Sequence, residues 1–347
     1  MNPANLIREH VRALAAYTPG EQPKQPGLIK LNTNENPYPP SPEVGKVLAG
    51  FTPADLRLYP DPVSQELRDE LARLNRVEPA QVFVGNGSDE ALALCTRAFV
   101  EPGQSIGYLD PSYSLYPVLA AIQHVPVHPV ALDDAFQWTR FDVDPSCRLF
   151  FITQPNAPTG MLHDRESIRA FCGSFPGVVL IDEAYADFAR ETCMDLVHTF
   201  ENVLVSRSFS KSYSLAGLRL GYVVGSAPLI AALHKIKDSY NVNMLTQRLG
   251  LAAVRDQAYM KATVAKVLAT RTHVATTLTE RGYQVFPSET NFLWIKPPRE
   301  TAADLFVRLR AANILTRHFT APRIADYLRV TIGTDDQMAR FLELAAD

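Results

Sequence analysis

Short, continuous apolar runs, each ended by polar or glycine-containing residues, constrain the fold of this chain more than any other feature. In the run Val178–Asp182, four aliphatic residues precede an aspartate. Similar runs predict strands at 81–84, 105–109, 148–153, 203–206 and 222–224. Helical periodicity follows Ser64 and Ser88 and separates several of these strands. Because continuous apolar strands are buried on both faces, the pattern predicts an α/β fold with helices covering a mostly parallel sheet.

The pattern changes after residue 230. The predicted elements there are helices at 229–240, 245–281 and 301–312, and strands at 291–295 and 327–332. We therefore expect a second, smaller α+β domain, joined by an amphipathic N-terminal helix around Leu6 to Leu14. The expected division is a large domain at 31–240 and a small domain formed by 1–30 with 241–347.

Composition excludes several classes of protein. The chain has 347 residues and a net charge of −3, without the basic excess that a nucleic-acid or anionic-membrane partner requires. No apolar run is long enough to cross a bilayer, and the charged N-terminus does not resemble a signal peptide. The four cysteines form no C-x-x-C pair, so we expect reduced thiols, no bound metal and a cytoplasmic protein.

Residues 31–42 are rich in asparagine and proline. Proline donates no backbone hydrogen bond, so the stretch is excluded from a central strand or a helix interior. The prediction is an ordered loop or a linker that crosses the surface.

Lys211 lies in a loop directly after the predicted strand at 203–206 and is flanked by Ser208 and Ser210. A lysine amine forms a Schiff base with an aldehyde cofactor. Hydroxyl groups and the fork of Arg219, eight residues on, suit a phosphate dianion. Taken alone, a serine-rich loop with one lysine is more often a solvated turn. Its position at a strand end favours a site, since open α/β sheets bind ligands there.

Residues 85–90 read Gly-Asn-Gly-Ser-Asp-Glu and lie between a predicted strand and a predicted helix. The free N–H groups of a helix N-terminus bind anions, and glycine allows close approach of the backbone. A plain capped helix is the simpler alternative. A dinucleotide fingerprint is excluded because Glu90 stands where the third glycine is needed.

Further polar side chains follow other strands. Asp182 ends an apolar strand, where a carboxylate needs a partner such as a protonated pyridine nitrogen, although a capping aspartate or a magnesium ligand is an alternative. Tyr185 and Asn156 are candidates for a ring oxygen, and Tyr113 is a candidate for stacking on a flat cofactor or for ordinary packing. Arg329, within the last predicted strand, needs an anion, either a substrate group or an internal aspartate.

Seven motifs occur in an order that resembles the class I/II aminotransferases of pyridoxal-phosphate fold type I, and among them the histidinol-phosphate aminotransferase group. They are LNTNENP at 31–37, YPDP at 59–62, GSDE at 87–90, PTG at 158–160, DEAY at 182–185, SFSK at 208–211 and LRLG at 218–221. The resemblance covers nearly the whole chain. It implies a large domain with a mostly parallel seven-stranded sheet, a smaller α+β domain and a homodimer.

The resemblance also implies residue roles. Lys211 would hold pyridoxal phosphate and move a proton, Asp182 would pair with the pyridine nitrogen, and Tyr185 and Asn156 would contact the ring oxygen. Tyr113 would stack on the ring. The phosphate would be bound by Gly87, Ser88, Asp89, Ser208, Ser210 and Arg219, with Tyr59 reaching it from the other subunit. The substrate cleft would be lined by Tyr17, Asn34, Arg317 and Arg329.

One position departs from the family pattern. Relatives commonly carry asparagine directly before Pro-Thr-Gly, where its amide contacts the ring oxygen, whereas this chain has Ala157 there and Asn156 one residue earlier. Either Asn156 reaches the ring oxygen or Tyr185 makes that contact alone.

The resulting expectation is a ping-pong transamination between histidinol phosphate and 2-oxoglutarate. The alternatives are an aromatic amino acid aminotransferase, a threonine-phosphate decarboxylase-like lyase on the same fold, and a non-catalytic ligand sensor. The sensor is the least favoured because such proteins carry an added DNA-binding domain, for which this chain has no spare length.

Overall fold

A seven-stranded sheet forms the centre of the larger part of the molecule in the computed structural model, which describes residues 2–346. Its strands lie in the order β2 (Val82–Gly85), β8 (Gly221–Gly225), β7 (Val203–Ser208), β6 (Val178–Asp182), β5 (Cys147–Thr153), β3 (Ser105–Asp110) and β4 (Val127–Ala131). β8 is antiparallel to both neighbours, and the other pairs are parallel. The sheet confirms the predicted fold class.

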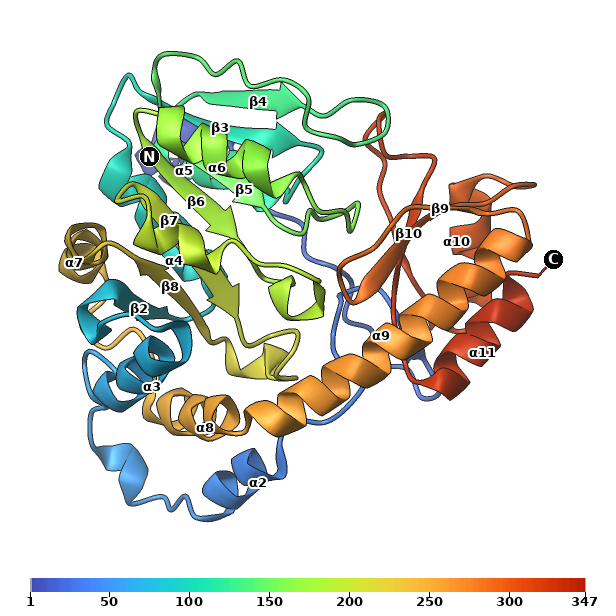
Figure 1. Cartoon of the computed structure of the whole chain (residues 1–347), viewed down its shortest axis with the longest axis horizontal. Helices are drawn as coiled ribbons and strands as arrows, with labels where there is room; N and C mark the ends of the chain where they lie inside the picture. The colour runs from blue at the N-terminus through green and yellow to red at the C-terminus, as the bar shows by residue number, and fades with distance from the viewer. Residues whose placement is uncertain (1, 347) are drawn as a thin grey trace.

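Helices cover both faces of this sheet (Figure 1). They are α3 (Gln65–Asn75), α4 (Ser88–Phe99), α5 (Leu115–Gln123), α6 (Arg165–Ser174) and α7 (Ala227–Ile236). Helix α8 (Met244–Arg255) packs on α3, and α2 (Pro42–Ala49) packs on α8. Alternate residues of a central strand enter two separate cores: Val179 and Ile181 lie in one, and Leu180 lies in the other. Burial on both faces explains why these strands read as continuous apolar runs.

The strand β4 was missed in the sequence because it contains Pro129. It lies at the edge of the sheet and pairs only with β3 among the described strands. Proline is tolerated in an edge strand because one side of that strand needs no ladder hydrogen bonds.

The smaller part of the molecule contains a four-stranded sheet in the order β12 (Arg317–His318), β13 (Leu328–Thr331), β10 (Phe292–Lys296) and β9 (Gln284–Val285). The long helix α9 (Gln257–Glu280) runs alongside it with α11 (Asp335–Leu344), and α10 (Ala302–Ala311) lies nearby (Figure 1). A parallel pair, β1 (Ile29–Lys30) with β11 (Ile314–Leu315), ties the N-terminal segment to this part.

Two segments lie elsewhere than the sequence suggested. The N-terminal helix is only the short α1 (Glu9–Ala13), it contacts α5 rather than the smaller sheet, and Leu6 is 74% exposed. Helical periodicity at the N-terminus therefore did not reflect burial. Helix α8 packs against α2 and α3, beside the larger sheet, although it follows residue 240. The division of the chain into domains stays a prediction.

The asparagine-rich segment does not simply cross the surface. Leu31, Asn32 and Asn34 are each at most 2% exposed, and only the following residues form the surface helix α2. The segment is the predicted ordered loop, but the alternative of a linker across the surface is wrong for 31–34, where the side chains of Asn32 and Asn34 are hydrogen-bonded in the interior. The four cysteines are buried and free. Among the described helices, none has the length and apolar character that crossing a membrane requires.

Candidate active site

A cavity of about 650 Å³ lies between the carboxyl ends of the central strands and the smaller sheet. Most of the predicted site residues line it: Tyr17, Asn34, Ser88, Asp89, Tyr113, Asp182, Tyr185, Ser208, Ser210, Lys211, Arg219, Arg317 and Arg329. They come from segments far apart in the sequence. A volume of this size accommodates a cofactor together with a small substrate.

Lys211 projects into the cavity from the loop after β7. Its Nζ donates a hydrogen bond to the carbonyl oxygen of Thr33 at 3.0 Å. Burial, reinforced by the positive charge of Arg329, lowers the pKa of Lys211 to about 8. A larger fraction of the amine is therefore neutral, and so nucleophilic, near physiological pH than for an ordinary lysine.

Asp182 is the last residue of β6 and is 3% exposed. Its carboxylate accepts hydrogen bonds from Tyr116 Oη and Ser206 Oγ, both at 3.1 Å. Burial raises the pKa of Asp182 to about 6. Among residues 2–346 no cationic side chain pairs with this carboxylate, so the site suits a cationic ring nitrogen.

The sequence analysis missed the residues that hold Asp182. Ser206 stands opposite Asp182 in the parallel ladder of β6 and β7, so strand register alone would have found it. Tyr116, on α5, also hydrogen-bonds Thr153 Oγ1 at 2.7 Å and stacks on Phe151. No local pattern marks Tyr116, because its role depends on how α5 packs on the sheet.

The opposite end of the cavity is built to hold an anion. The N-terminus of α4 begins at Ser88, and the preceding Gly87 has φ +85°. A Cβ at Gly87 would lie 2.7 Å from Arg219 Nη2, so glycine allows the guanidinium to close over the helix N-terminus. Arg219 also donates to Ser210 Oγ at 3.3 Å and pairs with Asp89 at 3.3 Å. Exposed N–H groups, hydroxyls and a guanidinium together fit a phosphate.

Tyr113 forms an aromatic wall of the cavity. Its ring meets Tyr17 edge-to-face, with centroids 6.0 Å apart, and its hydroxyl donates to Asp89 Oδ1 at 3.2 Å. Burial raises the pKa of Tyr113, so it is a neutral phenol at physiological pH.

Asn156 does not fill the predicted role. It is fully buried, its Nδ2 donates to Pro111 O and Thr159 Oγ1 at 3.0 Å each, and it does not line the cavity. Ala157 lines the cavity in its place. The Nδ2 group of Asn156, the donor that a ring oxygen would need, is engaged by Pro111 and Thr159, while Oδ1 is buried without a partner among the described residues. The predicted contact with a ring oxygen is therefore not supported.

Two further predicted residues lie outside the cavity. Gly87 acts through backbone shape, as described above. Tyr59 is 80% exposed and stacks on Tyr240 with ring centroids 4.5 Å apart, so it does not reach the cavity of its own chain.

The smaller sheet supplies two arginines to the cavity. Arg329 Nη2 donates to Asn32 O at 3.0 Å, while its Nε is buried without a partner. Burial lowers the pKa of Arg329. The rings of Phe292 and Phe319 lie 5.3 and 5.4 Å from the Arg329 guanidinium, and Phe319 also faces Arg317 at 5.3 Å. Phe319, which the sequence analysis did not single out, thus contacts both guanidinium groups, and within residues 2–346 neither of them forms an ion pair with a carboxylate.

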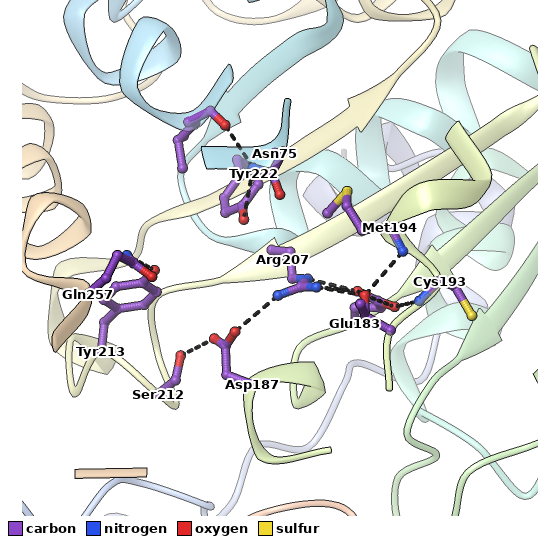
Figure 2. A network of polar contacts seen from close by, with 12 residues as sticks. Asn75, Glu183, Asp187, Cys193, Met194, Arg207, Ser212, Tyr213, Tyr222 and Gln257 are labelled. Carbon is purple, nitrogen blue, oxygen red and sulfur yellow. Dashed lines mark hydrogen bonds and ion pairs between the residues drawn. The ribbon is translucent and has the colours of Figure 1, made fainter. Parts of the chain in front are cut away.

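A buried ionic network on the other side of the sheet supports the Lys211 loop (Figure 2). Arg207 pairs with Glu183 at 2.7 Å and with Asp187 at 3.0 Å. Asp187 in turn accepts a hydrogen bond from Ser212 Oγ, next to Lys211 in the chain. Glu183 also accepts from Thr192, so its buried carboxylate is satisfied. The network therefore fixes the residue that follows Lys211.

The comparisons with known proteins agree with this geometry. Residues 26–344 match the model of aminotransferase class I and II. The chain is 45% identical to a histidinol-phosphate aminotransferase of Synechocystis sp. over 97% of its length and 96% of that protein. The crystal structure of histidinol-phosphate aminotransferase from Sinorhizobium meliloti in complex with pyridoxal-5'-phosphate superposes with a TM-score of 0.83 at 23% identity, covering 92% of this chain and 90% of that one.

A second solved structure, L-threonine-O-3-phosphate decarboxylase from Porphyromonas gingivalis, superposes with a TM-score of 0.80 at 22% identity and covers 91% of this chain and 98% of that one. At these identities, the two structures establish the shared fold alone.

Removing one partner of the buried network should be costly. Glu183→Ala leaves Arg207 buried without its closest carboxylate, and we expect a loss of about 3–5 kcal/mol in the free energy of unfolding. Arg340→Ala removes an exposed pair with Glu343 and should change it by less than about 1 kcal/mol. Urea unfolding of both variants measures the difference. Equal effects would show that the network does not stabilise the fold.

The lowered pKa of Lys211 predicts how cofactor capture depends on pH. Only the neutral amine attacks an aldehyde, so the rate should rise about tenfold per pH unit below the pKa of about 8 and level above it. Stopped-flow absorbance after mixing cofactor-free protein with pyridoxal phosphate measures this rate. A rate that still rises steeply at pH 9 to 10 would contradict the lowered pKa.

Proposed function

The chain belongs to the class I and II aminotransferase family, and from this premise we propose that it transfers the amino group of histidinol phosphate to 2-oxoglutarate in histidine biosynthesis. One observation carries the reaction type: Lys211, whose pKa is lowered, lies in the same cavity as the buried Asp182. Asp182 has no cationic partner among the described residues. The near-full-length similarity to histidinol-phosphate aminotransferases supports the choice of substrate.

Pyridoxal phosphate, when bound, supplies an electron sink that takes up an amino group from one substrate and passes it to the next. In the proposed arrangement, Lys211 would bind the cofactor aldehyde and would then move the proton between the substrate α-carbon and the cofactor C4′. Asp182 would pair with the protonated pyridine nitrogen. Its hydrogen bonds from Tyr116 and Ser206 hold the carboxylate in place.

The remaining cavity residues bind and orient the cofactor. Tyr185 would contact the ring oxygen, and Tyr113 would cover the ring. The phosphate would be bound by the N–H groups around Ser88 and Asp89, by the hydroxyls of Ser208 and Ser210, and by Arg219, all of which line the cavity. For this to happen Arg219 exchanges its ion pair with Asp89 for the phosphate.

The substrate end of the cavity suits two anionic substrates in turn. Histidinol phosphate brings a phosphate, and 2-oxoglutarate brings two carboxylates. Arg329 and Arg317 face the same cavity and offer forks to either anion. Tyr17 and Asn34 complete the wall on the N-terminal side. A single site that accepts both substrates alternately is what a ping-pong reaction requires.

Two features support a homodimer. Tyr59 does not line the cavity of its own chain and is 80% exposed, and in the proposal it would contact the cofactor phosphate of the partner subunit. Exposed apolar side chains also gather in the same part of the sequence, at Leu48, Leu56 and Leu58. Such exposure favours burial at an interface.

Four free, buried cysteines fit a reducing compartment, and we propose a cytoplasmic enzyme.

Spectroscopy of the half-reaction tests this function. Protein loaded with pyridoxal phosphate should show a visible absorbance band that histidinol phosphate bleaches and 2-oxoglutarate restores. Lys211→Ala should lack the band, whereas Lys235→Ala, which removes an exposed lysine on α7, should keep it.

The same assay separates the alternatives. Faster bleaching by phenylalanine than by histidinol phosphate would identify an aromatic aminotransferase. Release of carbon dioxide from threonine phosphate without a keto product would identify a lyase. Either result would overturn the proposed substrate.

A further inference from the structure

A directed chain of hydrogen bonds links the smaller sheet to Tyr185 through Asn34. Thr331 Oγ1 donates to Asn34 Oδ1 at 2.9 Å, and Asn34 Nδ2 donates to Tyr185 Oη at 2.8 Å. Asn34 and Thr331 are both buried, with 1% and 2% exposure. Low exposure excludes competition from bulk water, so the direction of each bond is set by the protein.

Thr331 fixes which way the Asn34 amide faces. Its hydroxyl accepts the backbone N–H of Asn34 at 3.0 Å and donates its own proton to Asn34 Oδ1. With the oxygen engaged, only the NH₂ group of Asn34 is left to face Tyr185. Asn291 Nδ2 also donates to Asn34 O at 3.0 Å and holds the backbone at φ +56°.

The direction of this bond decides what Tyr185 offers to the cavity. A phenol oxygen that accepts from Asn34 has used a lone pair and keeps its proton for another partner. Burial raises the pKa of Tyr185, so this proton is retained at physiological pH. Tyr185 lines the cavity beside Lys211, whose Nζ lies 5.8 Å from the ring centroid. The other titratable groups facing Tyr185 are Arg329, Asp182 and Tyr17.

The cavity wall at Ala157 makes the Tyr185 hydroxyl more important as a hydrogen-bond donor. Ala157 offers a methyl group to the cavity, and the amide of Asn156 is occupied by Pro111 and Thr159. A ring oxygen bound beside Lys211 therefore has the Tyr185 hydroxyl as its donor, without an amide from position 157.

We propose that Asn34 is a positioning residue that turns the Tyr185 proton toward the ring oxygen of the cofactor, and so compensates for the alanine at position 157. The inference rests on the proposed function in one respect, that pyridoxal phosphate binds at Lys211. Arg329 and Thr331 lie two residues apart on β13 and so share a face of the strand. Strand β13 thus presents Arg329 to the substrate and, through Thr331 and Asn34, also orients the Tyr185 hydroxyl toward the cofactor.

A pH titration of the visible absorbance of the loaded enzyme, without an amino donor, tests the proposal. A donor to the ring oxygen stabilises its anionic form and lowers the pH midpoint of the absorbance change. Asn34→Gly removes the amide and relieves the left-handed backbone, so the fold is not strained. We expect its midpoint to rise by about half a unit to one unit, the size of one hydrogen bond.

Four matched variants sharpen the test. Thr331→Val, which leaves the Asn34 amide without its orienting hydroxyl, should also raise the midpoint, and Thr331→Ser should keep the wild-type value. Asn34→Asp offers an acceptor to Tyr185, withdraws its proton and should raise the midpoint toward that of Tyr185→Phe. Ala157→Asn, which adds a second donor, should lower the midpoint.

The proposal is overturned if Asn34→Gly titrates with the wild-type midpoint while Tyr185→Phe shifts, even if Asn34→Gly lowers the melting temperature. That combination would assign Asn34 a structural role only. Since no substrate is present, the result is independent of whether histidinol phosphate proves to be the amino donor.

Discussion

The pairing of β6 with β7 is the constraint on which the site depends. Asp182 and Glu183 are adjacent in the chain, so their side chains turn to opposite sides, and the facing Ser206 and Arg207 do the same. On one side Asp182 lines the cavity and is held by a hydrogen bond from Ser206. On the other, Glu183 and Arg207 anchor Asp187 and, through it, the Lys211 loop (Figure 2). One strand pair therefore positions both the carboxylate and the lysine.

In the smaller sheet, a single strand likewise positions two groups of the site. Arg329 and Thr331 of β13 lie on one face, the first lining the cavity and the second orienting Asn34. The segment that carries Asn34 is held between Thr331, Asn291 and Tyr185. A movement of the smaller sheet would consequently displace Arg329. It would also displace Thr33, whose carbonyl accepts the Lys211 hydrogen bond, and the Asn34 amide that donates to Tyr185.

The sequence predicted the central strands because their burial on both faces leaves continuous apolar runs, as in Val178–Asp182. It missed β4, where Pro129 is tolerated only because the strand is at an edge. Asp182, Ser208 and Lys211 were predicted at the site because they lie at or after strand ends, whereas Tyr17, Asn34 and Arg317 were expected only from the family resemblance. Tyr116 and the bond from Asn34 to Tyr185 were not predicted, because they join elements whose relative placement is a tertiary property. The alanine at position 157 was visible in the sequence. That the Asn156 amide donates to Pro111 and Thr159 could be learned only from the structure.

The central claim is that Lys211 is the residue to which the cofactor is attached. Reduction of the pyridoxal-phosphate-loaded protein with borohydride makes that attachment permanent, and peptide mass mapping then locates it. The account predicts a single modified peptide, containing Lys211, that is absent in Lys211→Ala. A label on other lysines of the wild-type protein, with the Lys211 peptide unmodified, would contradict it.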